Sequence, residues 1–259
     1  MSELKREDIV SINQKGWDKI APSYYGGTAL PEYGPLALTE KELRLLPDLQ
    51  GKKVLELGCG SGHSLAYLWE IRNACELWGL DVSKTQIHFA EELLGEKDIP
   101  SRLFISSMDE NPGLPENYFD LVISIYALGW TPDLLHTFEL IHSYLKPGGV
   151  IVFSWEHPVY KSLSLDETID RYVIDKSYLH EGPVLDPSFR GVEIIIHHRM
   201  ISTYLNAMAQ SGLVLERIIE SGPNEALARE QDYRPEKWYS VPRACSIPTT
   251  FIVKAHKPA

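Results

Sequence analysis

A carboxylate stands directly before a run of closely spaced glycines. Glu56 lies in the apolar stretch 54–57, and Gly58, Gly60 and Gly62 follow it at alternate positions. Without Cβ atoms, glycines let the backbone adopt positive φ and let a ligand approach its N–H groups closely. Glu56 would repel a pyrophosphate at this place, but it suits a ligand that carries an ammonium group. For the glycine loop alone, the alternative is an ordinary strand-to-helix turn.

A second carboxylate follows about 20 residues after the glycines. Asp81 ends the short apolar run 77–81. At the carboxyl end of a strand beside the first one, such an acid faces the hydroxyls of a ribose. His63 stands where the last glycine of a dinucleotide-binding G-x-G-x-x-G loop would fall. The pattern therefore favours a nucleoside with a cationic group over a dinucleotide.

A parallel sheet must position these residues. Short apolar runs alternate with stretches of helical periodicity, which is typical of α/β folds that bind ligands at the carboxyl ends of their strands. Helices are expected near 5–21, 36–46, 83–94, 132–144 and 202–211. Strands are expected at 54–57, 77–81, 102–106, 119–125, 150–155, 191–201, 213–219 and 249–254.

Several segments, taken in order, resemble the class I S-adenosylmethionine-dependent methyltransferases, in particular the small-molecule branch related to ubiquinone and menaquinone biosynthesis enzymes. They read VLELGCGSG at 54–62, GLDVS at 79–83, FDLVIS at 119–124 and LKPGG at 145–149, and 17–25 is similar to the family's N-terminal lid. The resemblance implies a doubly wound, Rossmann-like sheet of seven strands, mostly parallel with the last one antiparallel, and helices on both faces. It also implies S-adenosylmethionine as cofactor.

The resemblance also indicates which residues would contact the cofactor. The family places the residues after the third strand against the adenine, and the end of the fourth strand near the methionyl part. A polar loop with one buried methionine is the alternative for the third-strand residues. The expected cofactor-binding residues are Tyr25, Glu56, Gly58, Gly60, Asp81, Val82, Ser107, Met108, Asp109 and Ile125.

The segment 24–35 has the glycine- and proline-rich composition of a mobile loop and is expected to act as a lid. Tyr24 or Tyr25 could close over a sulfonium, because a cation is attracted to an aromatic face. Two adjacent tyrosines cannot both face inward from an extended segment, and Tyr25 is the preferred one. Trp17 lies in a helical stretch and is expected in the core.

Two polar residues just past the fifth strand are candidates for catalysis. Glu156 and His157 would lie near the ligand edge, and His157 could take a proton near neutral pH. The alternative for His157 is a histidine that only orients the following insertion. Alternation along a strand sends His198 to the opposite face from His197 and Arg199, so at most one face can address the site. No cluster of carboxylates accompanies Asp120 or Asp133, and transfer without a metal is expected.

The composition narrows the class of substrate. The net charge of −11, with no cluster of basic residues, disfavours a nucleic-acid partner. The sequence has three cysteines without close spacing, and its N-terminus has no apolar core. It also has no run of about 18 apolar residues. These features predict a cytoplasmic protein without a membrane span. The expected activity is methyl transfer to a small molecule. A methyltransferase of modified tRNA bases and a dinucleotide-dependent oxidoreductase are the alternatives.

One domain is expected over residues 1–259. Residues 1–50 would hold the N-terminal helices and lid, and 51–155 the cofactor-binding core. The stretches 156–191 and 221–247 lack strand–helix alternation and are expected to be insertions that build a cap over the substrate. Their aromatic residues suit a pocket for a mostly apolar acceptor, although they could also pack only on one another. These are Tyr160, Tyr172, Tyr178, Phe189, Tyr233, Trp238 and Tyr239.

Overall fold

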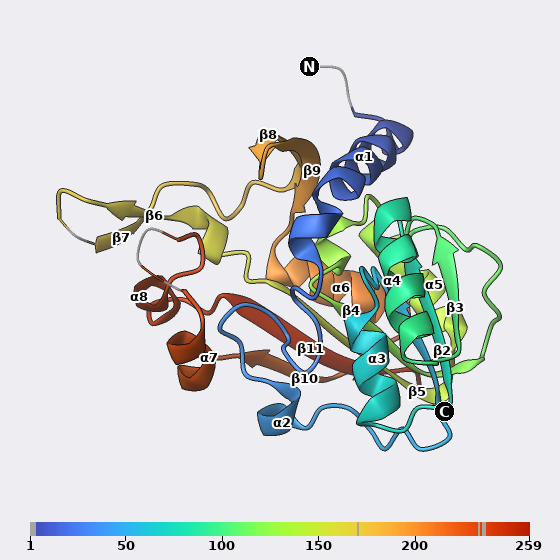
Figure 1. The fold of residues 1–259 in the computed structure, drawn as a ribbon. Coiled ribbons are helices and arrows are strands. Elements are labelled where there is room, and N and C mark those ends of the chain that lie inside the picture. Colours follow the sequence, from blue (N-terminus) through green and yellow to red (C-terminus); the bar gives the residue numbers. More distant parts are fainter. Residues whose placement is uncertain (1–3, 170, 233, 235–236) are drawn as a thin grey trace.

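The structure is a computed structural model that describes residues 4–169, 171–232, 234 and 237–259 (Figure 1). Its centre is a seven-stranded sheet in the order β10-β11-β5-β4-β1-β2-β3. The strands β1 to β5 pair in parallel, and β11 runs antiparallel to both β5 and β10. This arrangement confirms the expected sheet. The strands are β1 (Lys53–Leu57), β2 (Glu76–Asp81), β3 (Ser101–Ile105), β4 (Phe119–Ile125), β5 (Leu145–Glu156), β10 (Val214–Glu220) and β11 (Thr250–His256).

Helices cover both faces of this sheet, and each face has its own apolar core. The helices α3 (His63–Glu70) and α4 (Lys84–Glu96) pack on one face, and α5 (Leu134–Tyr144) and α6 (Ile201–Gln210) pack on the other. Successive residues of β1 point to opposite faces, so that Val54 joins the first core while Leu55 and Leu57 join the second. A buried parallel strand with apolar residues on both sides explains the continuous apolar runs in the sequence.

Side-chain caps fix where two of these helices begin. The Ser83 hydroxyl accepts a hydrogen bond from the Gln86 backbone N–H at 3.1 Å, as the sequence predicts for the start of α4. Asp133 caps α5 in the same way, by accepting from the backbone N–H of His136 at 3.0 Å. Both helices therefore begin at fixed points next to the carboxyl ends of β2 and β4.

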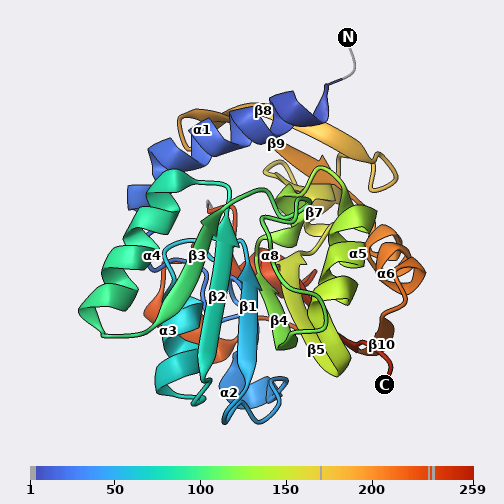
Figure 2. The same cartoon turned by 90° about the vertical axis from the view of Figure 1, so that its right-hand side faces the viewer.

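The N-terminal helix α1 (Arg6–Tyr24) does not cover a face of the sheet, and instead crosses beyond the carboxyl ends of the strands (Figure 2). The second expected helix, at 36–46, is reduced to the single turn α2 (Glu40–Leu43). The buried Glu40 carboxylate accepts the backbone N–H groups of Leu45 and Leu46 at 2.9 and 3.2 Å, and Arg44 adopts a left-handed φ of 49°. Together these end the helix.

The first insertion forms two hairpins outside the main sheet. The strands β6 (Leu163–Asp166) and β7 (Arg171–Ile174) form a hairpin that extends away from the body (Figure 1). The stretch expected as a strand at 191–201 becomes β9 (Val192–His198), which pairs with β8 (Gly182–Phe189). It does not enter the main sheet, because β8 supplies its partner locally. The short helices are α7 (Glu225–Glu230), α8 (Val241–Ala244), η1 (Leu128–Trp130) and η2 (Tyr160–Ser162).

The hairpin β8–β9 and helix α1 lie against each other beyond the carboxyl edge of the sheet (Figure 2). Asn13 in α1 joins them, because its side chain donates to the Ile195 carbonyl at 2.9 Å and accepts from the Ile195 N–H at 2.7 Å. These two elements therefore form one roof over the ends of the strands. Among the described helices, none is both long enough and apolar enough to cross a membrane.

Candidate active site

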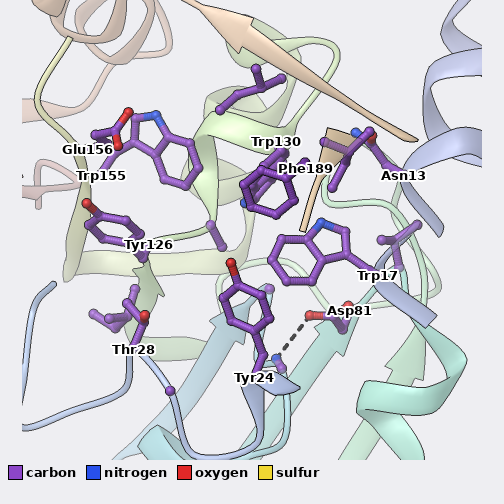
Figure 3. Close-up of a pocket in the computed structure, with 18 of the residues that line it drawn as sticks. Asn13, Trp17, Tyr24, Thr28, Asp81, Tyr126, Trp130, Trp155, Glu156 and Phe189 are labelled. Carbon is purple, nitrogen blue, oxygen red and sulfur yellow. Dashed lines mark hydrogen bonds between the residues drawn. The ribbon is translucent and has the colours of Figure 1, made fainter. Parts of the chain in front are cut away.

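A cavity of about 1050 Å³ lies between this roof and the carboxyl ends of β1, β2 and β4 (Figure 3). One side is lined by the glycine loop and the ends of β1 and β2, and the other by aromatic residues from β4, β5 and the two insertions. In Figure 3, Asp81 and Glu156 stand on opposite sides of the cavity, with Tyr24 and Trp17 between them. We call the two sides the glycine-loop side and the aromatic side.

The glycine loop needs its glycines for two reasons. Gly58, Gly60 and Gly62 have φ values of 71°, 50° and 80°, which L side chains rarely adopt. A Cβ at Gly58 would also lie 2.3 Å from the Cβ of Ala127, which follows β4. The Gly60 N–H donates to the Asp81 carboxylate at 3.0 Å. The loop therefore packs tightly against β4 while it is tied to the end of β2.

Asp81 ends β2 and lines the cavity. Its carboxylate accepts from the backbone N–H groups of Gly60 and Ser83, at 3.0 and 2.9 Å. Desolvation raises the pKa of Asp81 to about 6, although these two bonds act in the opposite direction. The remaining lone pairs of the carboxylate can accept hydrogen bonds from ligand hydroxyls.

Glu56 has a free oxygen at the glycine-loop side. Its side chain is buried and lines the cavity, and within the described residues Oε2 has no hydrogen-bond partner. Burial raises the pKa of Glu56 well above its usual value, and a hydrogen bond with Ser64 lowers it only partly. A buried carboxylate without compensation is costly. A cationic ligand group at this oxygen would supply the missing partner.

The residues expected at the adenine divide into two groups. Val82, Ser107 and Met108 line the cavity, as does Ile125 at the end of β4. Asp109 does not line it, although its side chain is fully buried. Its carboxylate instead accepts a bidentate pair of bonds from the Arg6 guanidinium, at 2.6 and 3.0 Å, and a bond from the Ser107 hydroxyl. Asp109 therefore anchors the start of α1, and this position does not support its expected contact with a ligand.

The lid residue that lines the cavity is Tyr24, whereas Tyr25, the preferred candidate, does not line it. Tyr25 is 49% exposed, and its ring packs on His63 and Phe89 at the outside. Because α1 continues to Tyr24, the segment is helical there and not extended, and Tyr24 shares the inward face of the helix with Trp17. Trp17, expected in the core, lines the cavity instead, with its ring centroid 5.2 Å from that of Trp130.

Polar residues of α1 that the sequence analysis did not single out fix the roof over the glycine-loop side. Gln14 donates to the Val82 carbonyl at 2.9 Å. Asp18 accepts from the Ser83 hydroxyl at 2.7 Å and from the Thr85 backbone N–H at 3.0 Å. Their spacing along the helix gives no indication of these contacts, because the partners belong to a distant segment.

Backbone groups of the expected lid lie against the glycine loop. The N–H groups of Gly26 and Leu30 donate to the hydroxyls of Ser61 and Ser64, at 3.4 and 3.2 Å. Residues 25–30 thus close over the loop in this structure. Thr28 borders the cavity below Tyr126 in the close-up (Figure 3).

The aromatic side centres on Glu156. Its Oε2 accepts from the Trp238 indole N–H at 2.7 Å and from the Tyr239 hydroxyl at 2.6 Å. The Tyr126 hydroxyl in turn donates to that of Tyr239 at 3.0 Å, and the ammonium of Lys161 lies 3.3 Å from Oε1. Desolvation raises the pKa of Tyr126 and Tyr239 well above their usual value, so both phenols are neutral. A chain of hydroxyls therefore ends at this carboxylate.

Glu156 and His157 point to opposite sides, because successive side chains at the end of a strand alternate. Glu156 lines the cavity, whereas His157 does not. The His157 Nε2 lies 2.6 Å from a Glu220 carboxylate oxygen, and its backbone N–H donates to the Thr249 carbonyl at 2.9 Å. His157 therefore joins β5 to β10 and to the start of β11, and this position does not support its expected role as a base.

The other expected polar residues also separate by alternation. His198 lines the cavity, whereas His197 and Arg199 do not. Asp120, at the start of β4, accepts from the Lys53 backbone N–H at 3.0 Å and from the Lys146 ammonium at 2.8 Å, so it joins strands at the far edge. In the part of the chain that the structure describes, no three His, Cys, Asp or Glu side chains gather closely enough to hold a metal ion.

The insertions supply part of the aromatic side. Phe189, Trp238 and Tyr239 line the cavity. Tyr178 lines a smaller neighbouring cavity, and Tyr160 and Tyr172 line neither. Tyr160 instead packs beneath Tyr239, with ring centroids 5.8 Å apart. Tyr233 lies outside the described residues.

Comparisons with known proteins agree with this geometry. A family described as "Methyltransferase domain" matches residues 55–153. Demethylmenaquinone methyltransferase of Geobacillus sp. is 29% identical over 104 residues, which cover 40% of this chain and 44% of that protein. Malonyl-[acyl-carrier protein] O-methyltransferase of Marinomonas sp. is 30% identical over 141 residues, 54% of this chain and 50% of that protein. The chain spans about half the length of the curated relatives it matches.

A solved structure matches over a longer stretch. The S-adenosylmethionine dependent methyltransferase from Mesorhizobium loti is 32% identical, with a TM-score of 0.71. The match covers 84% of this chain and 96% of that one. The chain belongs to the class I S-adenosylmethionine-dependent methyltransferases.

Proposed function

We propose that this protein transfers the methyl group of S-adenosylmethionine to a small-molecule acceptor. The observation that carries the proposal is the free carboxylate oxygen of Glu56, buried at the same cavity wall as the glycine loop and Asp81. S-adenosylmethionine carries an ammonium, a ribose and an adenine, and these three groups match what this wall offers. When bound, it supplies a methyl group on a positively charged sulfur, which is already activated for attack.

The chain's own groups would divide the binding as follows. Glu56 would hold the ammonium, and Asp81 would accept from the ribose hydroxyls. Val82, Ser107 and Met108 would flank the adenine, and Ile125 would lie near the methionyl part. The backbone at Gly58 and Gly60 leaves room for close approach. An ammonium buried here without a carboxylate beside it would be strongly disfavoured, and so would a buried carboxylate without a cation.

The roof and the aromatic side would align the acceptor and exclude water. Good alignment alone can supply roughly 7–11 kcal/mol of the barrier. Where the attacking atom carries a proton, we assign Glu156 as the base that finally holds it. Support comes from the Tyr126–Tyr239–Glu156 chain, which can pass a proton from the cavity to Glu156 Oε2.

A small molecule is the acceptor that charge and shape favour. The net charge of −11 opposes binding of a polyanion, and the acceptor side of the cavity is enclosed by aromatic rings. One relative named above is a demethylmenaquinone methyltransferase, and the other is an O-methyltransferase of malonyl-[acyl-carrier protein]. We place the protein in the cytoplasm, and three free cysteines support this location.

Ligand binding tests the cofactor assignment directly. Both S-adenosylmethionine and S-adenosylhomocysteine should raise Tm and give calorimetric Kd values near micromolar, about −8 kcal/mol. NAD is the matched negative ligand, because it brings a pyrophosphate towards Glu56. If neither sulfur ligand raised Tm at millimolar concentration, the assignment would fail. Incubation with S-adenosylmethionine and pooled metabolites, followed by a search for a mass gain of one methyl group, then identifies the acceptor.

A further inference from the structure

A second cavity, of about 520 Å³, adjoins the first cavity at Trp155, which lines both. Trp155, Glu156, Lys161, Lys176 and His198 border both cavities, so the two meet beside the catalytic candidate Glu156. The second cavity lies among the end of β5, η2, strand β9 and the start of α6. Nothing in the proposed cofactor site needs this space.

Its charged groups differ from those of the first cavity. Lys161, Lys176 and Arg199 border it, and among its described lining residues Glu156 is the single acid. Glu156 is already committed, because Oε2 accepts two hydrogen bonds and Oε1 lies 3.3 Å from the Lys161 ammonium. The Lys161 side chain is only 17% exposed, and Lys176, which borders both cavities, is exposed. The cavity therefore has an excess of positive charge.

The acids that line only the first cavity reinforce this difference. Glu56, Asp81, Asp186 and Asp232 all border the first cavity and not the second. Glu56 and Asp81 are the groups proposed to hold the cofactor. An acceptor with a negative group would be repelled on the glycine-loop side and attracted beside Lys161.

An imidazole on β9 lies beside these cations. His198 borders both cavities, and the positive charges of Lys161 and Lys176 act on its ring. Burial and these cations lower the pKa of His198 to about 4. The ring is therefore neutral near pH 7 and can donate one N–H to an acceptor atom.

We propose that the second cavity binds an anionic group of the methyl acceptor, a carboxylate or phosphate, between Lys161, Lys176 and the imidazole of His198. The apolar part of the same molecule would extend past Trp155 into the aromatic side of the first cavity. This inference rests on the proposed function, and it narrows the acceptor to small acids with an apolar body. The anionic group anchors the molecule and need not be the group that is methylated.

Matched probes can test this without turnover. With the protein saturated with S-adenosylhomocysteine, calorimetry should give a Kd for 3-phenylpropionate about tenfold lower than for the neutral 3-phenylpropanamide. Phenyl phosphate, as a third probe, decides between the two anion types. Titration with the acid should also shift the ring NMR signals of His198, which a charge effect elsewhere on the surface would leave in place.

Two lysine variants and one control locate the effect. Lys176→Met and the double variant Lys161→Met/Lys176→Met should reduce the preference for the acid over the amide, with the larger loss in the double variant. Lys237→Met is the control, because Lys237 borders only the first cavity, and it should keep the preference. Lys176 is exposed, so its replacement leaves folding intact and keeps the test valid even if the double variant unfolds.

Equal Kd values for acid and amide in the unmodified protein would overturn the inference. An equal loss of preference in Lys237→Met and Lys176→Met would also overturn it. Failure of S-adenosylhomocysteine to bind in the first step would instead overturn the proposed function. The two failures are therefore separate measurements.

Discussion

The two sides of the cavity are built in different ways. On the glycine-loop side, Glu56, the glycines and Asp81 lie at the ends of two adjacent parallel strands. The Asp81 carboxylate accepts hydrogen bonds from the nearby backbone N–H groups of Gly60 and Ser83. On the aromatic side, the Glu156 carboxylate accepts hydrogen bonds from Trp238 and Tyr239. These two residues follow more than eighty positions later, in a short irregular segment of the second insertion. Trp17 reaches the same space from the N-terminal helix (Figure 3).

This difference explains which side can vary. Strand pairing in the core fixes the glycine-loop side, so a change there disturbs both the ligand contacts and the fold. The aromatic side depends on segments that leave the sheet, and such connecting segments can change shape without loss of the core. We therefore expect changes on the glycine-loop side to affect cofactor affinity and stability, and those on the aromatic side to affect turnover.

The largest expected effect separates Glu156 from its neighbour. Glu156→Gln keeps an oxygen for Trp238 and Tyr239 but removes the base, so turnover of an acceptor that must lose a proton should fall by about 10²–10⁴-fold. The Kd for S-adenosylhomocysteine should stay the same. His157→Ala should lower the free energy of unfolding by roughly 1–3 kcal/mol, through loss of its bond to Glu220, and leave the pH profile of kcat unchanged. Steady-state kinetics and calorimetry measure both variants. If His157→Ala, and not Glu156→Gln, lost turnover and changed the pH profile of kcat, the assignment of the base would be reversed.

The glycine loop offers a matched pair for stability. Gly58→Ala brings a Cβ against Ala127 at a positive φ, and should cost roughly 3 kcal/mol of unfolding free energy. Gly60→Ala has open space around the new Cβ, with the nearest atom at 3.9 Å, so only the backbone cost of about 1 kcal/mol should remain. Urea unfolding measures both. Equal losses would show that contact with Ala127 is not what requires Gly58.

Asp81→Ala should weaken the binding of S-adenosylhomocysteine by about 10–100-fold, because roughly 1.5–3 kcal/mol of charged hydrogen bonding is lost. Asp120→Ala is the control, since Asp120 bonds Lys53 and Lys146 at the opposite edge of the sheet. It should alter stability and leave the Kd nearly unchanged. Similar Kd values in the two variants would contradict the placement of the ribose beside Asp81.

The smallest expected effect is a pH dependence of cofactor binding. The pKa of Asp81 is raised to about 6 in the free protein, and the ionised form accepts from ribose hydroxyls. The affinity for S-adenosylhomocysteine should therefore fall as the pH drops below 6, by about tenfold at pH 5 from this group. Glu56, whose pKa is also raised, acts in the same direction. In Asp81→Asn the slope should become shallower, and calorimetry that found an unchanged slope would remove Asp81 as its source.

The stability of the free protein should respond to pH with the opposite sign. Because the folded pKa of Asp81 lies above its unfolded value, its contribution is fully present below about pH 4 and is lost as the pH rises through 6. Saturation with S-adenosylhomocysteine should remove this loss. Urea unfolding with and without the ligand, at pH 4.5 and 6.5, compares the two states.

The sequence by itself determined the sheet and the glycine-loop side. Apolar runs bounded by glycines and carboxylates identified β1 and β2, and the order of the segments gave a mostly parallel sheet with an antiparallel strand. Glu56, Asp81, Gly58 and Gly60 lie at the cavity wall. They do so because each is within a few residues of a strand end, and parallel strands end at one edge.

Tertiary structure alone decided the roof and the aromatic side. Whether Tyr24 or Tyr25 faces inward depends on where α1 ends, and that depends on contacts of α1 with β9 and the start of α4. The roles of Glu156 and His157 depend on which side of β5 the insertions cover. Asp109 does not line the cavity, because the guanidinium of Arg6, more than a hundred positions earlier, binds its carboxylate. Such partners are set by packing between distant segments, which local residue patterns do not encode.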